Sequence, residues 1–219
     1  MLASALAGLT ILIIGDSHLT MPHYLIETLH MGLVEQGAKV HTIGVCGTNA
    51  GDWLKASPGT CGAAERVDSE KVKLLPRTSS TTPVSELIAR DKPDLLVIVM
   101  GDAMAGYDKP VFPKAWAWQH VSALTKVVAQ SGTPCAWVGP AWGTEGGKYQ
   151  KTFERAKLMS TFLEGNVAPC EYIDSLQFSK PGEWATTDGQ HFTASGYKAW
   201  GAAVTNALVS SAIVQGLKK

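Results

Sequence analysis

The sequence predicts a single α/β domain built on a five-stranded parallel sheet with helices on both faces. Three observations lead to this fold class. Short apolar segments alternate along the chain with longer segments of helical periodicity, which is typical of a parallel sheet covered by helices. The length of 219 residues is usual for one such domain. Neither an internal repeat nor a segment with the composition of a linker divides the chain, so we treat residues 1–219 as one domain.

The expected strands are short segments of aliphatic and β-branched residues, and the expected helices are longer segments with apolar residues three or four positions apart. The strands are expected at Thr10–Gly15, 40–45, 93–101, 134–140 and 170–174. The helices are expected at 22–36, 84–91, 116–131, 149–163 and 194–214. In the first helix, Leu25, Leu29 and Leu33 repeat at helical spacing, and Gly37 ends the pattern.

Two segments lie outside this alternation. Residues 56–82 have no clear periodicity and many small or polar residues, so we expect a long irregular excursion with at most one short helix. Residues 1–8 are small and apolar but lack the basic start of a signal peptide, and we expect a flexible N-terminus there. They are either a start placed ahead of a mature secreted chain or the native start of a cytosolic one.

The composition excludes several classes of function. The chain has 19 basic and 19 acidic residues and a formal net charge of +0, without the basic patch typical of nucleic-acid-binding proteins. No apolar segment approaches the roughly 20 residues needed to span a bilayer. We therefore expect neither a nucleic-acid partner nor a transmembrane segment, while the oligomeric state stays open.

The first strand runs directly into three polar residues, Asp16, Ser17 and His18. One interpretation is a helix cap, because Asp and Ser both accept bonds from free backbone N–H groups at the start of a helix. The other is a nucleophilic serine at the carboxyl edge of a parallel sheet, where open α/β folds bind their ligands.

A second group of polar residues lies near the other end of the chain, in TTDGQHFTASGY. Asp188 and His191 are three residues apart, just before the last expected helix. A nucleophilic serine needs a base within hydrogen-bond reach, and the base needs a carboxylate that fixes its tautomer. One Asp-x-x-His turn supplies both groups. The alternative is that these residues only cap the last helix and decorate the surface.

Taken together, GDSH near the start and DGQH near the end resemble the motifs of the SGNH/GDSL hydrolase family. The resemblance extends over nearly the whole chain, including the glycine turn after the second strand and the strand at 95–100. It implies a flavodoxin-like three-layer α/β/α sandwich that hydrolyses or transfers acyl groups of esters. It also implies that Ser17 is the nucleophile, His191 the general base and Asp188 its orienting partner.

The resemblance further implies three hydrogen-bond donors that stabilise the oxyanion. The first is the backbone N–H of Ser17. The second is a glycine in GVCGTN, for which Gly47 aligns best and Gly44 is the alternative. A glycine needed only for a tight turn would explain either position equally well.

The third donor of the family is an asparagine, and here the sequence departs. In VMGDAMAG, Ala103 stands at that position and has no side-chain donor. Asn49 is a possible substitute, although an asparagine after a glycine turn is also a common turn residue. Asp102 would serve only when protonated. Hydrolysis is therefore expected to be slow.

Three further side chains are candidates for binding substrate. Trp142 and Trp53 lie in loops expected at the catalytic edge, and an indole ring stacks well on a sugar. His18 adjoins the nucleophile. The alternatives are core packing for the tryptophans and a capping role for His18. The remaining histidines lack the spacing of metal ligands and no Cys-x-x-Cys is present, so we expect neither a metal nor another cofactor.

The four cysteines occur in two suggestive places. Cys46 and Cys61 bracket the start of the irregular segment, and Cys135 and Cys170 begin two strands that are expected to be neighbours. Two disulfides at these positions would indicate a secreted or periplasmic protein. Four buried thiols in a cytoplasmic protein are the alternative.

These observations predict a serine esterase that cleaves O-acyl, and specifically O-acetyl, groups from a carbohydrate through an acyl-enzyme. Its substrate would be a small ester or an acylated oligosaccharide or polysaccharide. One alternative is a polysaccharide O-acyltransferase with the same chemistry, since some members of the family modify bacterial exopolysaccharides. Another is a weakly active domain that serves as a carbohydrate-binding module.

Overall fold

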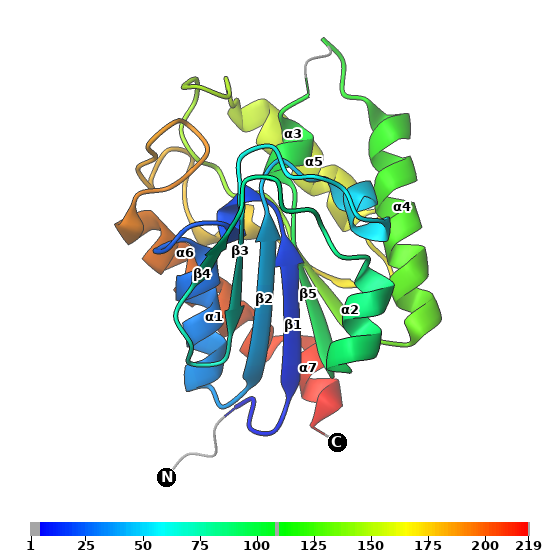
Figure 1. Cartoon of the computed structure of the whole chain (residues 1–219). Coiled ribbons are helices and arrows are strands. Elements are labelled where there is room, and N and C mark those ends of the chain that lie inside the picture. The colour runs from blue at the N-terminus through cyan, green and yellow to red at the C-terminus, as the bar shows by residue number, and fades with distance from the viewer. Residues whose placement is uncertain (1–4, 108–109, 219) are drawn as a thin grey trace.

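The computed structural model describes residues 5–107 and 110–218, which form one seven-stranded sheet between two layers of helices (Figure 1). The strands are β1 (Thr10–Gly15), β2 (Lys39–Val45), β3 (Ala63–Val67), β4 (Lys73–Leu75), β5 (Leu95–Val99), β6 (Cys135–Val138) and β7 (Glu171–Ile173). They lie in the order β4-β3-β2-β1-β5-β6-β7.

The five expected strands correspond to β1, β2, β5, β6 and β7, and they run parallel to one another. Their order, with the first strand between the second and third, is the flavodoxin-like arrangement. The predicted fold class is therefore confirmed. The predicted number of strands is wrong, because the sheet has seven.

The two additional strands, β3 and β4, come from the segment that we expected to be irregular. β3 pairs antiparallel with β2, and β4 pairs antiparallel with β3, so they extend one edge of the sheet. Their sequences, AAERV and KLL, carry little intrinsic strand preference. Pairing with the edge of β2 stabilises them, and a periodicity search along the chain does not detect that contribution.

The helices cover both faces of the sheet (Figure 1). They are α1 (Leu25–Glu35), α2 (Val84–Asp91), α3 (Asp102–Ala105), α4 (Lys114–Ser131), α5 (Phe153–Glu164), α6 (Ala194–Ser210) and α7 (Ala212–Leu217). Three short 3-10 helices complete the described secondary structure: η1 (Ser17–Leu19), η2 (Ala50–Leu54) and η3 (Ser175–Phe178). The predicted last helix is two helices, because Ser211 has extended backbone angles and its side chain caps α7.

β1 lies at the centre of the core. Its residues Ile11 and Ile13 pack with α1, α6 and α7, while Leu12 and Ile14 pack with α2, α4 and α5 on the other face. All four side chains are 0% exposed. Burial on both faces explains why this strand reads as a continuous apolar run rather than an alternating one. The residues that follow β1 are therefore attached to the most buried strand of the sheet.

The expected flexible N-terminus covers residues 1–8, of which 1–4 lie outside the described part of the chain. Residues 5–8 form a turn in which Leu6 is 1% exposed, and the Leu6 N–H donates to the carbonyl of Gln36. This part of the terminus is packed onto the domain.

A disulfide joins Cys135 at the start of β6 to Cys170, which directly precedes β7, with the two Cα atoms 4.5 Å apart. The two strands are neighbours, as the sequence predicts, and the disulfide is one of the two alternatives that the sequence left open for these cysteines. No helix in the described ranges has the length and apolar character that crossing a membrane requires.

Candidate active site

Ser17 lies in the turn that leaves the carboxyl end of β1. Gly15, the last residue of the strand, has no side chain because a Cβ there would collide with the carbonyl of Val99 on β5. The Asp16 carboxylate accepts a bond of 3.2 Å from the His18 N–H and caps η1. Asp16 is therefore a helix cap, and this is compatible with a nucleophilic serine, because the cap holds Ser17 at the edge of the sheet.

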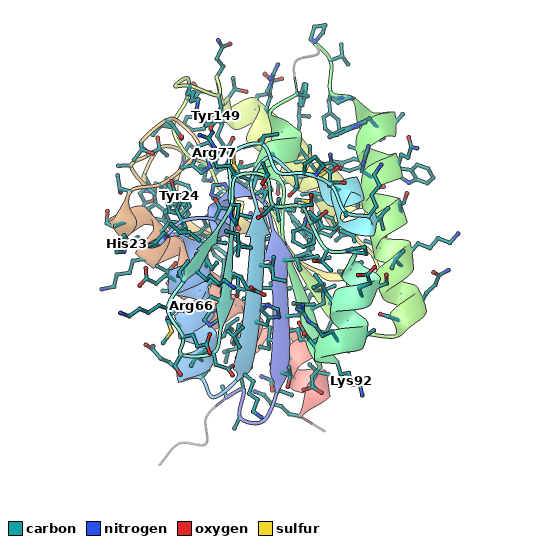
Figure 2. All side chains as sticks on the ribbon, viewed as in Figure 1. His23, Tyr24, Arg66, Arg77, Lys92 and Tyr149 are labelled. Atoms are coloured by element: carbon teal, nitrogen blue, oxygen red, sulfur yellow. A yellow bond between two sulfur atoms is a disulfide. The ribbon has the colours of Figure 1, made fainter. Side chains whose placement is uncertain are left out.

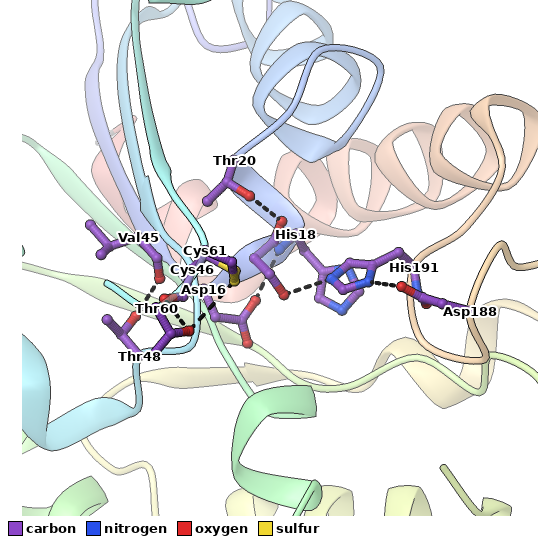
Figure 3. Close-up of a disulfide and its surroundings, with 11 residues drawn as sticks. Asp16, His18, Thr20, Val45, Cys46, Thr48, Thr60, Cys61, Asp188 and His191 are labelled. Carbon is purple, nitrogen blue, oxygen red and sulfur yellow. Dashed lines mark hydrogen bonds and ion pairs between the residues drawn. A yellow bond between two sulfur atoms is a disulfide. The ribbon is translucent and has the colours of Figure 1, made fainter. Parts of the chain in front are cut away.

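His191 and Asp188 lie side by side in the loop before α6 (Figure 3). His191 reaches Ser17 although the two residues are 174 positions apart in the sequence. His191 Nε2 is 2.7 Å from Ser17 Oγ, and His191 Nδ1 is 2.7 Å from Asp188 Oδ2. The other Asp188 oxygen accepts bonds from the backbone N–H groups of Gln190 and His191, at 3.0 and 2.8 Å. The structure thus brings the three predicted residues into the arrangement of a serine, a base and an orienting carboxylate.

The surroundings of His191 keep its ring neutral. Burial, and then the nearby His18, lower the pKa of His191 below its ordinary value of 6.5. Burial opposes the charge on Asp188, but the hydrogen bonds from His191 and Gln190 outweigh it and lower the pKa of Asp188. An ionised Asp188 accepts a hydrogen bond from Nδ1–H, so Nε2 carries no proton and is left to accept a hydrogen bond from the Ser17 hydroxyl. A ring in this state can take a proton from Ser17 at neutral pH.

Two tyrosines hold the His191 ring from different sides. Tyr24 stacks on it with 5.7 Å between ring centroids and 20° between planes. Tyr149 meets it edge-on, with 5.6 Å between centroids and 74° between planes. Offset-stacked and edge-on contacts are the favourable geometries for such rings, so the two contacts restrict how far the imidazole can turn.

Two backbone N–H groups at the cavity have no described hydrogen-bond partner. The N–H groups of Ser17 and Gly47 donate to no other described residue, and both residues line the cavity described below. Gly47 lies in the turn after β2 with φ of +81°, a left-handed conformation that favours glycine. Gly44 has a different role, because it ends the pairing of β2 with β1 and a Cβ there would collide with the backbone of Leu19.

The Gly47 turn is tied down by a second disulfide, between Cys46 and Cys61 (Figure 3). Their Cα atoms are 5.3 Å apart, and the N–H of Thr60 donates to the carbonyl of Cys46 at 2.9 Å. The bridge also lines the cavity. It therefore holds the Gly47 N–H in place relative to Ser17.

The position of the third donor holds no side-chain donor. Ala103 lines the cavity, and its own N–H donates to Asp16 Oδ2 at 3.4 Å. Asn49, the possible substitute, caps η2 by accepting from the Gly51 N–H at 2.9 Å, and it is not among the described residues that line the cavity. The structure therefore uses Asn49 as a turn and cap residue, which was the alternative interpretation.

Asp102 and His18 belong to a buried network beneath the cavity. Asp102 Oδ1 accepts from Lys151 Nζ at 2.6 Å, and its Oδ2 lies 2.7 Å from His18 Nε2. Lys151 also donates to the carbonyl of Ala141, and His18 Nδ1 bonds to the Tyr197 hydroxyl. Burial opposes the charge on Asp102, but Lys151 and His18 outweigh it and lower the pKa to about 2. Asp102 is therefore ionised and cannot donate a hydrogen bond.

This network corrects the expectation for His18, which we placed among the substrate-binding residues. Its side chain is only 2% exposed, and both ring nitrogens have partners inside the protein. His18 connects Asp102 to the helix α6 through Tyr197 and does not line the cavity. It supports the site from below.

The two tryptophans are also structural. Trp53 is 0% exposed and packs in the core on the α4 side of the sheet, so its predicted role in binding substrate is wrong. Trp142 is half-buried, donates its indole N–H to the carbonyl of Leu176 at 2.9 Å and packs edge-on against Phe153. It is not among the described residues of the cavity. The side chain of a loop residue near an active site can point into the cavity or into the protein interior. The sequence alone does not distinguish these two orientations.

A cavity of about 430 Å³ opens at Ser17. Its described lining consists of Ser17, Cys46, Gly47, Thr60, Cys61, Arg77, Asp102, Ala103, Gly106, Lys148, Tyr149, Gln190 and His191. Sequence reasoning missed five polar members of this set: Thr60, Arg77, Lys148, Tyr149 and Gln190. Gln190 lies inside the DGQH motif and its position next to His191 was the available signal, whereas the other four lie in loops without a pattern.

No group of three or more His, Cys, Asp or Glu side chains in the described ranges is arranged to hold a metal ion.

Known proteins resemble this chain in sequence or in fold. No protein-family model matches the chain. Protein BcsX of Komagataeibacter xylinus is 42% identical over 204 residues, which cover 92% of this chain and 77% of that protein.

Among solved structures, a peptidoglycan O-acetylesterase superposes with a TM-score of 0.58 at 12% identity, covering 98% of this chain and 93% of its own. A GDSL-like lipase from Bacteroides thetaiotaomicron superposes with a TM-score of 0.54 at 11% identity, covering 91% and 87%. At such low identity these likenesses concern the fold. The fold is that of the SGNH/GDSL hydrolases, which confirms the resemblance stated from the motifs.

Proposed function

Because this chain belongs to the family of Protein BcsX and has the fold of the SGNH/GDSL hydrolases, we propose that it is a serine esterase that cleaves O-acetyl esters of a carbohydrate. The observation that carries the proposal is the continuous bond chain from Ser17 Oγ through His191 to Asp188, with both distances at 2.7 Å. A helix cap alone would not require His191 to lie against Ser17.

The reaction follows from this geometry. Ser17 Oγ attacks the ester carbonyl while His191 Nε2 takes its proton, and the N–H groups of Ser17 and Gly47 stabilise the oxyanion. The tetrahedral intermediate collapses, His191 returns the proton to the leaving sugar oxygen, and the acyl group stays on Ser17. Water then attacks the acyl-enzyme with His191 as base, which releases the acid and restores Ser17.

The cavity supports a substrate of moderate size. Its volume of about 430 Å³ falls within the usual range of ligand pockets, about 300–1,000 Å³. An acetyl ester on a sugar is the substrate class consistent with the O-acetylesterase of the same fold.

A second candidate function is transfer of the acyl group to a carbohydrate hydroxyl. The absence of a side-chain donor at Ala103 supports it, because a weakened oxyanion site slows deacylation by any nucleophile and gives a carbohydrate time to bind to the acyl-enzyme. A bound sugar hydroxyl, held close to the acyl carbon, would then compete with water.

We also propose that the protein works in an oxidising compartment, as a secreted or periplasmic enzyme. The two disulfides support this location, because such bonds form and persist outside the reducing cytosol.

A serine-directed phosphonate with mass spectrometry tests the proposal most directly. Attachment of one phosphonate to Ser17, together with Ser17-dependent release of p-nitrophenol from its acetyl ester, is the expected result. Comparing the acetyl with the octanoyl ester measures the acyl pocket, and adding an oligosaccharide acceptor detects transfer. Binding of a glycan without labelling or turnover would instead indicate a carbohydrate-binding module and would overturn the esterase.

Turnover of a neutral ester should rise with pH and reach half its maximum below pH 6.5. Protonated His191 cannot take the Ser17 proton, and burial places its pKa below the ordinary value. The measurement is kcat/KM from about pH 4 to pH 8, with circular dichroism at each pH to confirm folding. A half-maximum above pH 6.5 would contradict the assignment of His191 as base.

Opening the Cys46–Cys61 disulfide should lower turnover before it unfolds the domain. The bridge closes a separation of 15 residues, worth about 3 kcal/mol of stability, and it fixes the Gly47 donor. The test is Cys46→Ser/Cys61→Ser, with Cys135→Ser/Cys170→Ser as the matched control that removes a bridge away from the cavity. Only the first pair should reduce kcat at temperatures where both proteins are folded. Four free thiols in the denatured, non-reduced protein would contradict both the bridge and the proposed location.

A further inference from the structure

Two cationic side chains line the catalytic cavity without a described carboxylate as partner. Arg77 and Lys148 are both exposed, and neither forms an ion pair within the described ranges. Figure 2 shows Arg77 and Tyr149 close together at the same end of the molecule. Lys148 Nζ lies 5.2 Å from the centre of the Tyr149 ring. The two charges therefore come from segments far apart in the sequence and meet at one opening.

The other charges of the lining do not offset these cations. Asp102 is the carboxylate in the described lining, and it is 2% exposed. Both of its oxygens are already bound, to Lys151 and to His18. Since Lys151 neutralises Asp102 inside the protein, the described residues at the accessible part of the cavity carry net positive charge, which raises the local concentration of anions.

Gln190 adds an uncharged polar group to the same wall. It is 7% exposed, and its side-chain amide bonds to no described residue, although its backbone N–H donates to Asp188. It lines the cavity at Ser17 and also the small hollow beside it. Its amide atoms are not among the buried polar atoms that lack a partner in the described ranges, so they reach the open cavity, where they can donate to or accept from a polar ligand group.

We propose that the ester bound in this cavity carries a carboxylate next to the scissile bond, held by Arg77 and Lys148. A guanidinium binds a carboxylate through two parallel hydrogen bonds, and a lysine adds a point charge. The carboxylate comes either from the acyl group, as in a monoester of a dicarboxylic acid, or from the sugar, as in a uronic acid. This inference rests on the proposed esterase function and specifies its substrate class.

The experiment compares matched neutral and anionic esters in two arms. In the acyl arm, the p-nitrophenyl ester of butyric acid is compared with the p-nitrophenyl hemiester of succinic acid, each corrected for the rate with Ser17→Ala. In the sugar arm, an O-acetyl methyl glucoside is compared with the methyl glucuronoside that is acetylated at the same hydroxyl. One arm should show kcat/KM at least about tenfold higher for the anionic ester, and the arm identifies the source of the carboxylate.

The variants Arg77→Gln and Lys148→Gln should each reduce the ratio of anionic to neutral kcat/KM several-fold, and the double variant should bring it close to one. About 1 M salt should do the same to the wild type, because it screens exposed charges. Lys157→Gln on α5 is the control, since Lys157 is exposed but does not line the cavity. A ratio of anionic to neutral kcat/KM close to one in both arms would overturn the inference. So would an anionic preference that survives in the double variant.

Its failure can be distinguished from failure of the esterase. Ser17-dependent turnover of neutral esters without an anionic preference overturns the carboxylate alone. If no ester is turned over, the esterase is overturned, and calorimetric binding of succinate and of methyl glucuronoside to Ser17→Ala tests the carboxylate site separately. If succinate or methyl glucuronoside binds and the binding is lost in Arg77→Gln/Lys148→Gln, the carboxylate site is supported. If neither compound binds, the carboxylate site is overturned.

Discussion

Replacing Ser17 with alanine should abolish ester turnover and leave the domain folded. Loss of the nucleophile in a serine hydrolase costs on the order of 10⁶ in kcat. The fold should persist because Ser17 lies in a turn at the sheet edge. Asp16, not Ser17, caps η1, and the preceding strand β1 is buried on both faces. The measurements are kcat on p-nitrophenyl acetate, phosphonate labelling and the melting temperature.

Ser69→Ala is the matched control for this change. Ser69 is exposed in the connection between β3 and β4, at the opposite end of the sheet from Ser17. It should retain wild-type turnover and labelling. Turnover that survives in Ser17→Ala at a comparable rate would assign the chemistry to another residue and remove the basis of the proposed mechanism.

Replacing Ala103 with asparagine should raise kcat by up to about 10². Removing one oxyanion donor from a serine hydrolase costs about 10²–10³, so supplying a donor at the vacant position should recover part of that factor. KM should change little, because the added bond strengthens only as charge develops on the oxygen. Ala103 is half-exposed at the cavity wall, which leaves room for a larger side chain. Steady-state kinetics on p-nitrophenyl acetate measure both constants.

Ala103→Leu is the matched control, since leucine is about as large as asparagine and has no donor. It should leave kcat low, and its melting temperature shows whether the larger side chain is tolerated next to Met104. If Ala103→Asn folds normally with unchanged kcat, another group already occupies the third donor position. Gln190 is then the first residue to replace, because it lines the same cavity.

The fold could be predicted from the sequence wherever burial leaves a local pattern. β1 reads as a strand because both of its faces are covered, and α2 has the predicted bounds because its amphipathic pattern is complete within eight residues. The edge strands β3 and β4 leave no such pattern, since alanine, lysine and glutamate become strand residues there by pairing with β2.

The candidate site divides along similar lines. The sequence indicates Ser17, Asp188 and His191 because they lie in two short motifs, GDSH and DGQH. Each motif forms a single local turn, so its residues are close in sequence as well as in space. The partners of Asp102 do not: His18 and Lys151 approach it from segments whose spatial relation is set by the whole fold. Arg77 reaches the cavity from the far edge of the sheet for the same reason, and no spacing along the chain encodes that approach.

The catalytic residues stand on elements of unequal stability. Ser17 follows β1, which hydrogen-bonds to strands on both sides. His191 and Asp188 lie in a loop that is held by an isolated bridge between Thr186 and Phe192, by bonds within the loop, and by two backbone bonds from the loop at 144–148. Segments of this kind open at a smaller free energy than the global unfolding of the core, and their amide hydrogens exchange faster. We therefore expect that warming separates the base from the nucleophile while the sheet is still intact, so that the temperature of inactivation lies below the temperature of melting.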